Sequence, residues 1–536
     1  MKEREHGKNK MQCMLRIVFV IAILGKAVPT AHAEAAQGLK ENAANALLRP
    51  GEAGCLSTDT LSKDTIVESG GTCPAQAHTA GQVCPFEQVR LTPGLWDEAS
   101  GQWWMSVSFV SLQESIPPPA KPIVRLSNKK ETIEGKGTEE GCVLVFTGTS
   151  TSYEYFSSGG PYFNPATMFY SSPLIHHTDV GPLQPSTTFY YQVGRSEGSE
   201  SPPLLRGTIF QFRTPPAPGI APAAAGDSMT IVMIGDIGQT TNSNDTACTV
   251  KDRWKADASV AAAVIIGDMA YADGDGNRWD TWGRLMEPTF SHLPLLVLPG
   301  NHEIEYDAKT GMPFTAYRHR FRMPSNLPEN IGPVTGPQDF LYEGGSSYYS
   351  FNVGLVHFVM INNYNTHSGL VDLATDPQKL FVEADLEAVD RSKTPFVIVC
   401  MHNPLYNSNL GHHGEETTHI TRSWAEVLFI KYAVDAVFAG HVHAYERNGG
   451  VAYGTPSPNA PIYITVGNGG NHEGLYNEVI RYFVFSCTEG DRNVKCLHIR
   501  VCVCVWCVVC VLRWDSGYQS LHTVSSAMAD TTAMAR

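Results

Sequence analysis

Clusters of basic residues are nearly absent from this chain, because Lys and Arg gather only within its first ten residues. Proteins that bind nucleic acid use such clusters to displace counterions, and the formal net charge here is -14. A nucleic-acid partner is therefore not expected. The acidic balance does not exclude phosphate substrates, since bound metal cations can dominate the local field of a site.

Apolar runs long enough to cross a bilayer are also missing near the N-terminus. The run Ile17–Leu24 is much shorter than the roughly 20 residues of a membrane-spanning helix. A polar start precedes it, and Ala31–Ala33 follows with a small-x-small cleavage pattern. We therefore expect residues 1–33 to be a secretory signal peptide, with Met11 or Met14 as alternative start sites. A buried helix of the mature fold is the competing interpretation.

A signal peptide implies a secreted protein, extracellular or in the vacuole or cell wall. No stable membrane anchor is expected. Such compartments permit disulfides, although pairing cannot be deduced from the sequence. Asn244 begins an Asn-Asp-Thr sequon in a polar stretch that we expect to be a loop, which makes it a candidate glycosylation site. The cysteines in question are Cys55, Cys73, Cys84, Cys142, Cys248 and Cys400.

No internal repeat of fixed period is visible, and the composition instead changes in blocks. Residues 34–83 are rich in Ala, Gly, Ser and Thr and are expected to form a low-complexity extension. Residues 84–216 carry short β-type runs separated by turn residues, which predicts a β-sandwich. Its His176 and His177 resemble metal ligands, but with no carboxylate nearby a structural role is favoured. A Pro/Ala/Gly linker occupies residues 217–228.

Residues 229–485 have an α/β pattern in which apolar strands alternate with helical stretches such as Pro377–Val389 and Thr421–Tyr432. Five of the strands each lead into a polar cluster, as is usual where function lies at the carboxyl ends of buried strands. Each cluster alone is weak, because Gly-Asp after a strand is commonly a turn or a helix cap. The clusters are GDIG (235–238), GDMAYAD (267–273), GNHE (300–303), HNP (402–404) and GHVH (440–443).

Together the five clusters supply the ligand types of two adjacent metal ions. Carboxylate and phenolate oxygens suit Fe(III), whereas imidazole suits divalent Zn, Fe or Mn. Asp268 is the natural candidate to bridge the two ions, since an Asp has two oxygens. His441 and His443 lie two positions apart, so either the backbone bends there or each reaches a different metal.

These motifs resemble the metallophosphoesterase signature. Tyr271 and the stretch after His402 resemble the purple acid phosphatases, especially the plant-type enzymes with an N-terminal β domain. The resemblance covers roughly Phe86 to Asn477. It implies an α/β metallophosphoesterase domain, a βαβαβ sandwich of two mixed sheets with flanking helices. The segment Pro173–Gly194 resembles a fibronectin type III-like domain, which would make the preceding part a β-sandwich of that kind.

The resemblance also implies two metal sites that share Asp268, one for Fe(III) and one for a divalent ion that is Zn, Mn or Fe. The Fe(III) ligands would be Asp236, Asp268, Tyr271 and His443. The divalent ligands would be Asp268, Asn301, His402 and His441.

Three histidines correspond to the family's residues that face the substrate. His302 matches the substrate-facing histidine, and His412 and His413 match a pair that contacts the phosphate and the leaving group. Asp273 matches an outer-shell acid, for which a helix cap is the alternative.

The implied activity is that of an acid phosphatase, a phosphoric monoester hydrolase in which a metal-bound hydroxide attacks phosphorus. His302 or His413 would then protonate the departing alkoxide. The motifs do not separate monoesters from phosphodiesters, nucleotide diphosphates or phytate. A non-catalytic secreted binding protein is a further alternative, although no metal ligand is missing. The partners would be small phosphate esters, and the oligomeric state stays open, with a homodimer as one option.

The last block, residues 486–536, departs from the family with a run rich in Cys and Val between Val501 and Leu512. Cys504, Cys507 and Cys510 have the spacing of a metal cluster, and a membrane anchor is a second option. A read-through or mis-spliced terminus is the interpretation that fits this atypical tail best.

Overall fold

The computed structural model describes eight stretches of the chain with their side chains and two short strands by their backbone. The proposed signal peptide lies outside these residues, as do most of the low-complexity extension and most of the atypical tail. In the part that is described, no helix has the length and apolar character of a membrane span. The stretches are 86–111, 120–136, 142–157, 168–197, 203–220, 229–333, 341–365 and 374–476, and the strands are 65–67 and 510–512.

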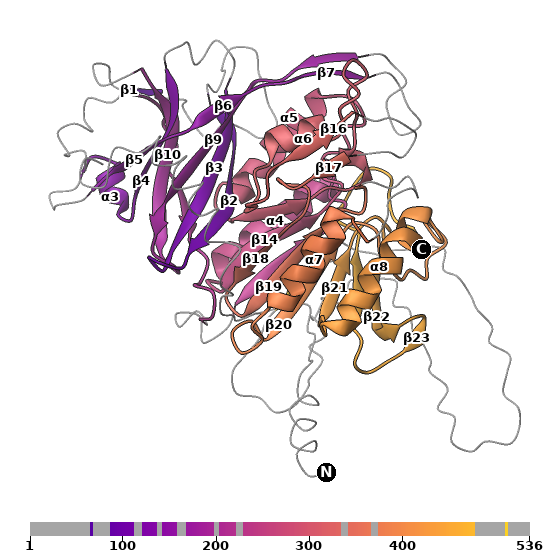
Figure 1. Ribbon diagram of the computed structural model, residues 1–536. Coiled ribbons are helices and arrows are strands. Elements are labelled where there is room, and N and C mark those ends of the chain that lie inside the picture. The colour runs from indigo at the N-terminus through magenta and orange to yellow at the C-terminus, as the bar shows by residue number, and fades with distance from the viewer. Residues whose placement is uncertain are drawn as a thin grey trace, which may run out of the picture.

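The N-terminal part consists of two β-sheets that lie side by side, with the short helix α3 (Lys130–Ile133) at their edge (Figure 1). One sheet has the order β2 (Glu87–Asp97), β3 (Gln102–Ser111), β9 (Leu174–Leu183) and β6 (Thr149–Thr151). The other has the order β1 (Thr65–Val67), β11 (Leu204–Arg206), β10 (Thr188–Ser196), β4 (Lys121–Ser127) and β5 (Leu144–Thr147), with β12 (Phe210–Arg213) also paired to β10.

Alternating apolar side chains hold these two sheets together. Met105, Val107 and Phe109 of β3 are fully buried and belong to the same core as Tyr191 and Val193 of β10. This period of two is what a strand with one face on a core requires. The β-sandwich expected from the short β-type runs is therefore present.

The two histidines of β9 are structural, as the sequence favours. His176 lies between Ser111 Oγ at 2.7 Å and Ser150 Oγ at 2.9 Å. His177 lies 2.8 Å from Ser108 Oγ, and burial lowers the pKa of both histidines to about 3. Both are therefore neutral core residues that form hydrogen bonds.

The C-terminal part contains two larger sheets, each with a parallel centre. The first has the order β15 (Leu295–Leu298), β14 (Val260–Ile266), β13 (Thr230–Ile234) and β25 (Cys510–Leu512). The second has the order β18 (Tyr349–Val353), β19 (Val356–Ile361), β20 (Phe396–Met401), β21 (Ala436–Ala439), β24 (Ile462–Val466), β22 (Tyr445–Ala452) and β23 (Thr455–Pro456). Two small hairpins accompany them, β7 (Glu154–Ser157) with β8 (Met168–Ser171) and β16 (Asn330–Gly332) with β17 (Leu341–Glu343).

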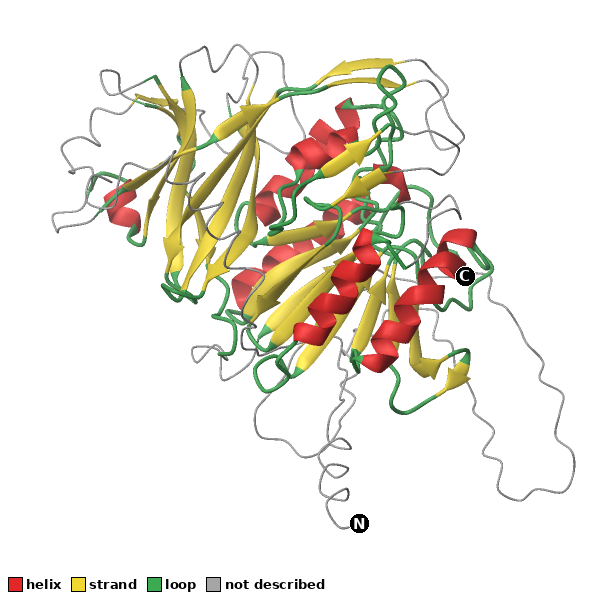
Figure 2. Ribbon diagram, in the orientation of Figure 1, coloured by secondary structure: helices red, strands yellow, loops and turns green. Residues whose placement is uncertain are grey.

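Helices cover the outer faces of these sheets (Figure 2). In β19, Phe358 and Met360 belong to the core shared with β13–β15, whereas Val359 and Ile361 pack against the helices on the opposite face. The expected α/β metallophosphoesterase arrangement of two mixed sheets with flanking helices is thus confirmed. The helices are α4 (Thr241–Ala256), α5 (Asn277–Phe290), α6 (Thr315–Arg320), α7 (Pro377–Ala388) and α8 (Glu416–Lys431).

Strand β25 comes from the atypical tail. Its backbone pairs antiparallel with β13, so that Met233 lies opposite Cys510 and Ile231 opposite Leu512. Part of the tail thus extends the sheet that carries the first polar cluster.

Buried polar contacts join the N-terminal part to the C-terminal part. Arg320 Nη2 donates to Asp280 Oδ1 at 2.9 Å and to Tyr170 Oη at 2.6 Å. Arg206 and Glu287 form a second buried ion pair at 2.7 Å. Since a buried charge is tolerated only when paired, these contacts define how the two parts dock.

Candidate metal centre

The five polar clusters meet at one edge of the two sheets, because each follows the carboxyl end of a strand. The strands are those that the apolar runs predict, namely β13, β14, β15, β20 and β21. At four of the seven expected ligands the backbone turns with a left-handed conformation, which non-glycine residues rarely adopt. The φ values are 57° at Asp236, 51° at Asp268, 47° at Tyr271 and 65° at His441. Strain of this kind is typical of functional sites.

Two glycines allow the loops that carry these ligands to approach one another closely. A Cβ atom at Gly300 would collide with Asp268 Oδ1, and one at Gly440 would collide with Asp236 Oδ2. Any larger residue at either position would therefore displace an expected ligand.

One group of side chains surrounds Asp236. Tyr271 Oη donates to Asp236 Oδ1 at 3.4 Å and lies 3.0 Å from His443 Nε2. His443 Nε2 itself lies 3.5 Å from Asp236 Oδ1. The backbone N–H of His441 donates to both Asp236 oxygens at 2.9 Å, which holds the carboxylate in place.

A second group surrounds Asn301. Its Oδ1 lies 3.1 Å from His402 Nε2 and 3.0 Å from His441 Nδ1. His402 Nε2 is also 3.0 Å from Asp268 Oδ2. Asp268, His402 and His441 each offer one ligand atom within 4.8 Å of the others. The structure therefore brings together all seven residues that the sequence proposes as metal ligands.

The charges of this cluster suit cations. Asp236 is 0% and Asp268 is 1% exposed, and no Lys or Arg of the described stretches forms an ion pair with either carboxylate. Burial opposes ionisation of Asp268, but His402 and His302 hold its pKa well below its usual range. Two buried carboxylates with imidazole, amide and phenol groups next to their oxygens match the donor set of a dinuclear Fe(III)–divalent centre.

Burial and neighbouring carboxylates also decide the protonation of the imidazole groups. Burial works against it, but Asp268 and Asp236 raise the pKa of His402 to about 9. Burial lowers the pKa of His441 to about 4 despite its contact with Glu415. His441 is thus neutral at ordinary pH, which is the form that binds a metal.

Glu303 ties the loops of this site together, although the sequence gives it no role beyond its place in GNHE. Its carboxylate accepts from the backbone N–H groups of Asp268 at 2.8 Å, Met269 at 2.9 Å and Gly300 at 2.8 Å. Burial, reinforced by the nearby Asp268, raises the pKa of Glu303 to about 8.

His302 sits beside the cluster and is held by Asp273, the expected outer-shell acid. His302 Nδ1 lies 2.5 Å from Asp273 Oδ1, while its Nε2 lies 4.0 Å from Asp268 Oδ2. The ring is 4.2 Å from that of Tyr271. One ring nitrogen is therefore anchored and the other faces the cluster.

The two remaining catalytic candidates differ. His412 lies over His441, with 3.9 Å between ring centroids, and its Nε2 is 3.0 Å from Tyr476 Oη. His413 is exposed, and no side-chain hydrogen bond joins it to any described residue. The expected pair is thus split, because the chain turns at His412 with a φ of 57°.

Glu415 is the residue that sequence reasoning missed most clearly. Its Oε1 lies 2.6 Å from His412 Nδ1, and its Oε2 lies 2.9 Å from His441 Nε2. Asn403 Nδ2 donates to the same Oε2 at 2.9 Å and its Oδ1 accepts from Tyr364 Oη. Only the spacing of Glu415 after His412 could have pointed to it.

The candidate glycosylation site departs from expectation. Asn244 lies in the first turn of α4 rather than in a loop, and Thr246 of the sequon is 1% exposed. Thr240 caps this helix through a reciprocal bond with Ser243, which is why the polar stretch is helical.

Among the cysteines, Cys142 is disulfide-bonded whereas Cys248 and Cys400 are free.

Comparison with known proteins agrees with this geometry. Residues 229–445 match the family described as calcineurin-like phosphoesterase. The chain is 36% identical to "Phosphoenolpyruvate phosphatase" of Allium cepa over 351 residues, which cover 62% of this chain and 64% of that protein. It is 34% identical to "Purple acid phosphatase 22" of Arabidopsis thaliana over 377 residues, which cover 70% and 71%. A third relative, "Fe(3+)-Zn(2+) purple acid phosphatase 12" of Arabidopsis thaliana, is 34% identical over 330 residues, with 58% and 62% covered.

A solved structure shares the fold. It is that of "purple acid phosphatase PPD1 isolated from yellow lupin (Lupinus luteus) seeds", with a TM-score of 0.56 and 21% identity, covering 74% of this chain and 67% of that one. The alignments with the Allium cepa protein and with purple acid phosphatase 12 of Arabidopsis thaliana span less than two thirds of those two proteins.

Proposed function

The chain belongs to the purple acid phosphatases, and on that basis we propose that it hydrolyses phosphate monoesters as an acid phosphatase with a dinuclear Fe(III)–divalent metal centre. The observation that carries this proposal is the meeting of seven ligand-type side chains from five strand ends, around two buried carboxylates without a Lys or Arg partner in the described stretches. A binding protein with an inactive site would not need all seven.

Asp236, Tyr271 and His443 would hold Fe(III), and Asn301, His402 and His441 would hold the divalent ion, with Asp268 shared. The contacts within each group support this division, since Tyr271 and His443 lie next to Asp236 whereas His402 and His441 lie next to Asn301. The name of the Fe(3+)-Zn(2+) relative favours Zn as the divalent ion. When bound, the ions would neutralise phosphate charge and lower the pKa of water.

The protein's own groups would orient the ester and manage the proton. With Nδ1 held by Asp273, His302 can present Nε2 to a phosphoryl oxygen or to the leaving group. His412, fixed between Glu415 and Tyr476, would contact the phosphate from the other side. The exposed His413 would be free to meet the larger part of a substrate.

Phosphate monoesters are the main proposal, with phosphodiesters, nucleotide diphosphates and phytate as alternatives. The name of the Allium cepa relative adds phosphoenolpyruvate to the substrates worth testing. A panel of these compounds at equal concentration would rank them by kcat/KM.

The remaining parts of the chain fit a secreted enzyme. We propose that residues 1–33 direct secretion, that residues 84–216 form a fibronectin type III-like domain, and that Asn244 carries a glycan. The disulfide at Cys142 supports an oxidising compartment. The two facing sheets of the N-terminal part support the domain assignment.

Metal analysis combined with a visible absorption spectrum tests the proposal. The purified protein should contain one iron and one divalent ion per chain and should be coloured by a tyrosinate–Fe(III) band. Tyr271→Phe should remove that band while iron remains. A colourless, iron-loaded and fully active wild-type protein would show that the assignment of Tyr271 is wrong.

A further inference from the structure

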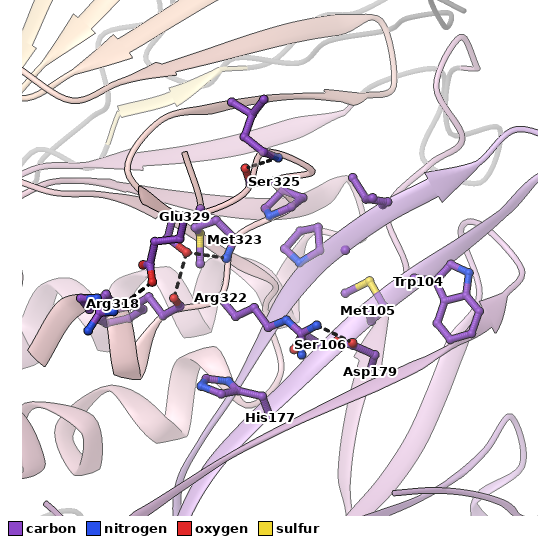
Figure 3. Close-up of a pocket in the computed structure, with 18 of the residues that line it drawn as sticks. Trp104, Met105, Ser106, His177, Asp179, Arg318, Arg322, Met323, Ser325 and Glu329 are labelled. Atoms are coloured by element: carbon purple, nitrogen blue, oxygen red, sulfur yellow. Dashed lines mark hydrogen bonds and ion pairs between the residues drawn. The ribbon is translucent and has the colours of Figure 1, made fainter. Parts of the chain in front are cut away.

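A cavity of about 420 Å³ between the β-sandwich and the loop that follows α6 carries its charges in pairs (Figure 3). Arg322 pairs with Asp179 at 3.1 Å, and Arg318 pairs with Glu329 at 3.1 Å. None of the residues proposed for metal binding or catalysis lines this cavity. Its charged lining residues are thus all matched, whereas the edge of the candidate metal centre contains a tyrosine to which no role has yet been given.

This tyrosine, Tyr476, lies in the segment 474–476, which follows β24 and packs against His443. The backbone N–H of Tyr476 donates to the carbonyl oxygen of His443 at 3.0 Å, and the Tyr476 ring stacks on the His443 ring with 4.8 Å between centroids and 5° between planes. His443 Nδ1 lies 3.1 Å from the carbonyl oxygen of Gly474. Since a carbonyl can only accept, Nδ1 carries the proton, and Nε2 next to Asp236 is left to bind a metal.

The hydroxyl of Tyr476 reaches the other group of proposed ligands. Its Oη lies 3.0 Å from His412 Nε2, and the His412 ring lies over that of His441 with 3.9 Å between centroids. Tyr476 therefore contacts a proposed Fe(III) ligand with its ring and a proposed substrate-facing histidine with its hydroxyl.

Hydrogen bonds at both nitrogens fix the orientation of the His412 ring. Glu415 Oε1 lies 2.6 Å from His412 Nδ1, and an ionised carboxylate can only accept, so Nδ1 is the donor. In the neutral ring, Nε2 then accepts from the hydroxyl of Tyr476. Without this hydroxyl, the Nε2 edge of His412 would lose the contact that holds it.

The loop that carries His412 also holds Tyr476 in place. Asn409 Nδ2 donates to the carbonyl oxygen of Tyr476 at 3.2 Å. A Cβ atom at Gly411 would lie 2.8 Å from Cδ2 of the Tyr476 ring, which is closer than a side chain can approach without displacing the ring. The loop and the tyrosine are thus packed together, which restricts where the hydroxyl can lie.

We propose that Tyr476 is a positioning residue of the active site, whose hydroxyl orients His412 towards the phosphate group and whose ring keeps His443 aligned. The inference rests on the proposed phosphatase function, because that function gives His412 a phosphate to contact. The two actions belong to different atoms of one side chain, so substitutions can separate them.

Tyr476→Phe tests the hydroxyl, because it keeps the ring. Isothermal titration of the full-length, metal-loaded protein with inorganic phosphate should show binding weakened roughly 3- to 10-fold, the effect of one hydrogen bond. The KM for phenyl phosphate should rise by a similar factor with kcat nearly unchanged, as expected when binding alone is lost. Unchanged phosphate affinity would overturn the proposal. Tighter phosphate binding would overturn it as well, because the hydroxyl would then compete with phosphate for His412.

The effect of the hydroxyl should pass through His412. In a His412→Ala background, Tyr476→Phe should change phosphate affinity by less than about twofold, since the partner of the hydroxyl is already gone. A full effect in that background would mean that Tyr476 does not act on His412. Tyr406→Phe is the matched control, because it removes another half-buried hydroxyl, which donates to Glu426, and it should bind phosphate like the wild type.

Tyr476→Leu tests the ring. Loss of stacking on His443 should speed the release of iron to a chelator by about 10-fold, the lower end for groups that support a metal ligand. Tyr476→Phe should retain iron like the wild type. Equal iron release from Tyr476→Leu and the wild type, with normal thermal unfolding midpoints, would show that the ring does not align His443.

These measurements separate the role of Tyr476 from the proposed function. A wild-type protein that binds phosphate but hydrolyses no ester would contradict the phosphatase activity, while phosphate affinity and iron release would still decide the role of Tyr476. An active wild type with an indistinguishable Tyr476→Phe variant would overturn the role of the hydroxyl and leave the phosphatase activity standing.

Discussion

Replacing Glu415 by glutamine should weaken metal binding at the divalent site and leave metal binding at the Fe(III) site unchanged. The carboxylate holds two imidazoles at once, His412 at 2.6 Å and His441 at 2.9 Å. Glutamine keeps the shape but turns one oxygen into an NH₂ group, so one imidazole loses its acceptor. A hydrogen bond to a charged group is worth about 1.5–3 kcal/mol. Replacing a residue that hydrogen-bonds to a metal ligand typically costs about 10- to 100-fold in metal affinity or activity. We expect a loss in that range for the divalent ion and for kcat.

The iron site supplies the internal reference for this measurement. Glu415 contacts none of Asp236, Tyr271 or His443 through a hydrogen bond in the described stretches. Dialysis against increasing chelator, followed by metal analysis, should therefore strip the divalent ion from the variant first. The visible band should keep its intensity. Glu416→Gln, at the exposed neighbouring position, is the matched control and should behave like the wild type.

Two results would refute this reasoning. Unchanged divalent affinity with unchanged kcat would mean that Glu415 does not position His441. Equal loss of both metals would mean that the substitution damages the whole centre.

Three further predictions follow from the geometry. Asp268→Asn should lose both metals and activity together, measured by metal analysis and turnover, and retention of two ions would contradict the bridging role. His302→Ala should lower kcat by about 10²–10⁴, the range of a general acid, with metal content retained and with a larger loss for alkyl phosphates than for nitrophenyl phosphate; an equal loss for both would indicate phosphate positioning instead. Burial lowers the pKa of His176 from 6.5 to about 3, so the unfolded state binds its proton first and stability should fall as pH drops from 6.5 towards 3. His176→Gln should reduce that dependence, by up to about 1.4 kcal/mol per pH unit, in urea unfolding at pH 7 and pH 4.5, and an unchanged slope would mean that His176 takes up its proton without unfolding.

The strand ends could be predicted from the sequence because two independent signals coincide there. An apolar run such as Ala263–Ile266 marks a buried strand, and the Gly-Asp that follows marks a change of direction. The structure ends β14 at Ile266 and places Asp268 in a left-handed turn. Helices α7 and α8 could also be predicted, although α8 begins at Glu416, five residues before the expected start.

Residues whose roles depend on tertiary contacts could not be predicted in this way. Glu415 acquires its role only because α8 starts beside His441, which lies on another strand end. His413 resembles His412 in sequence, but a single backbone turn separates their environments. The polar stretch around Asn244 predicts a loop, yet Thr240 caps a helix there.

The pairing of β25 with β13 has a consequence for how the protein folds. The two strands lie about half the chain apart, and such distant pairings form late. Until β25 arrives, the outer side of β13 is an open row of N–H and C=O groups that can pair with another molecule. A chain that lacks residues 510–512 would keep every proposed metal ligand and still expose this row. Its defect should therefore appear as self-association during refolding, while the molecules that do reach the native state keep their specific activity.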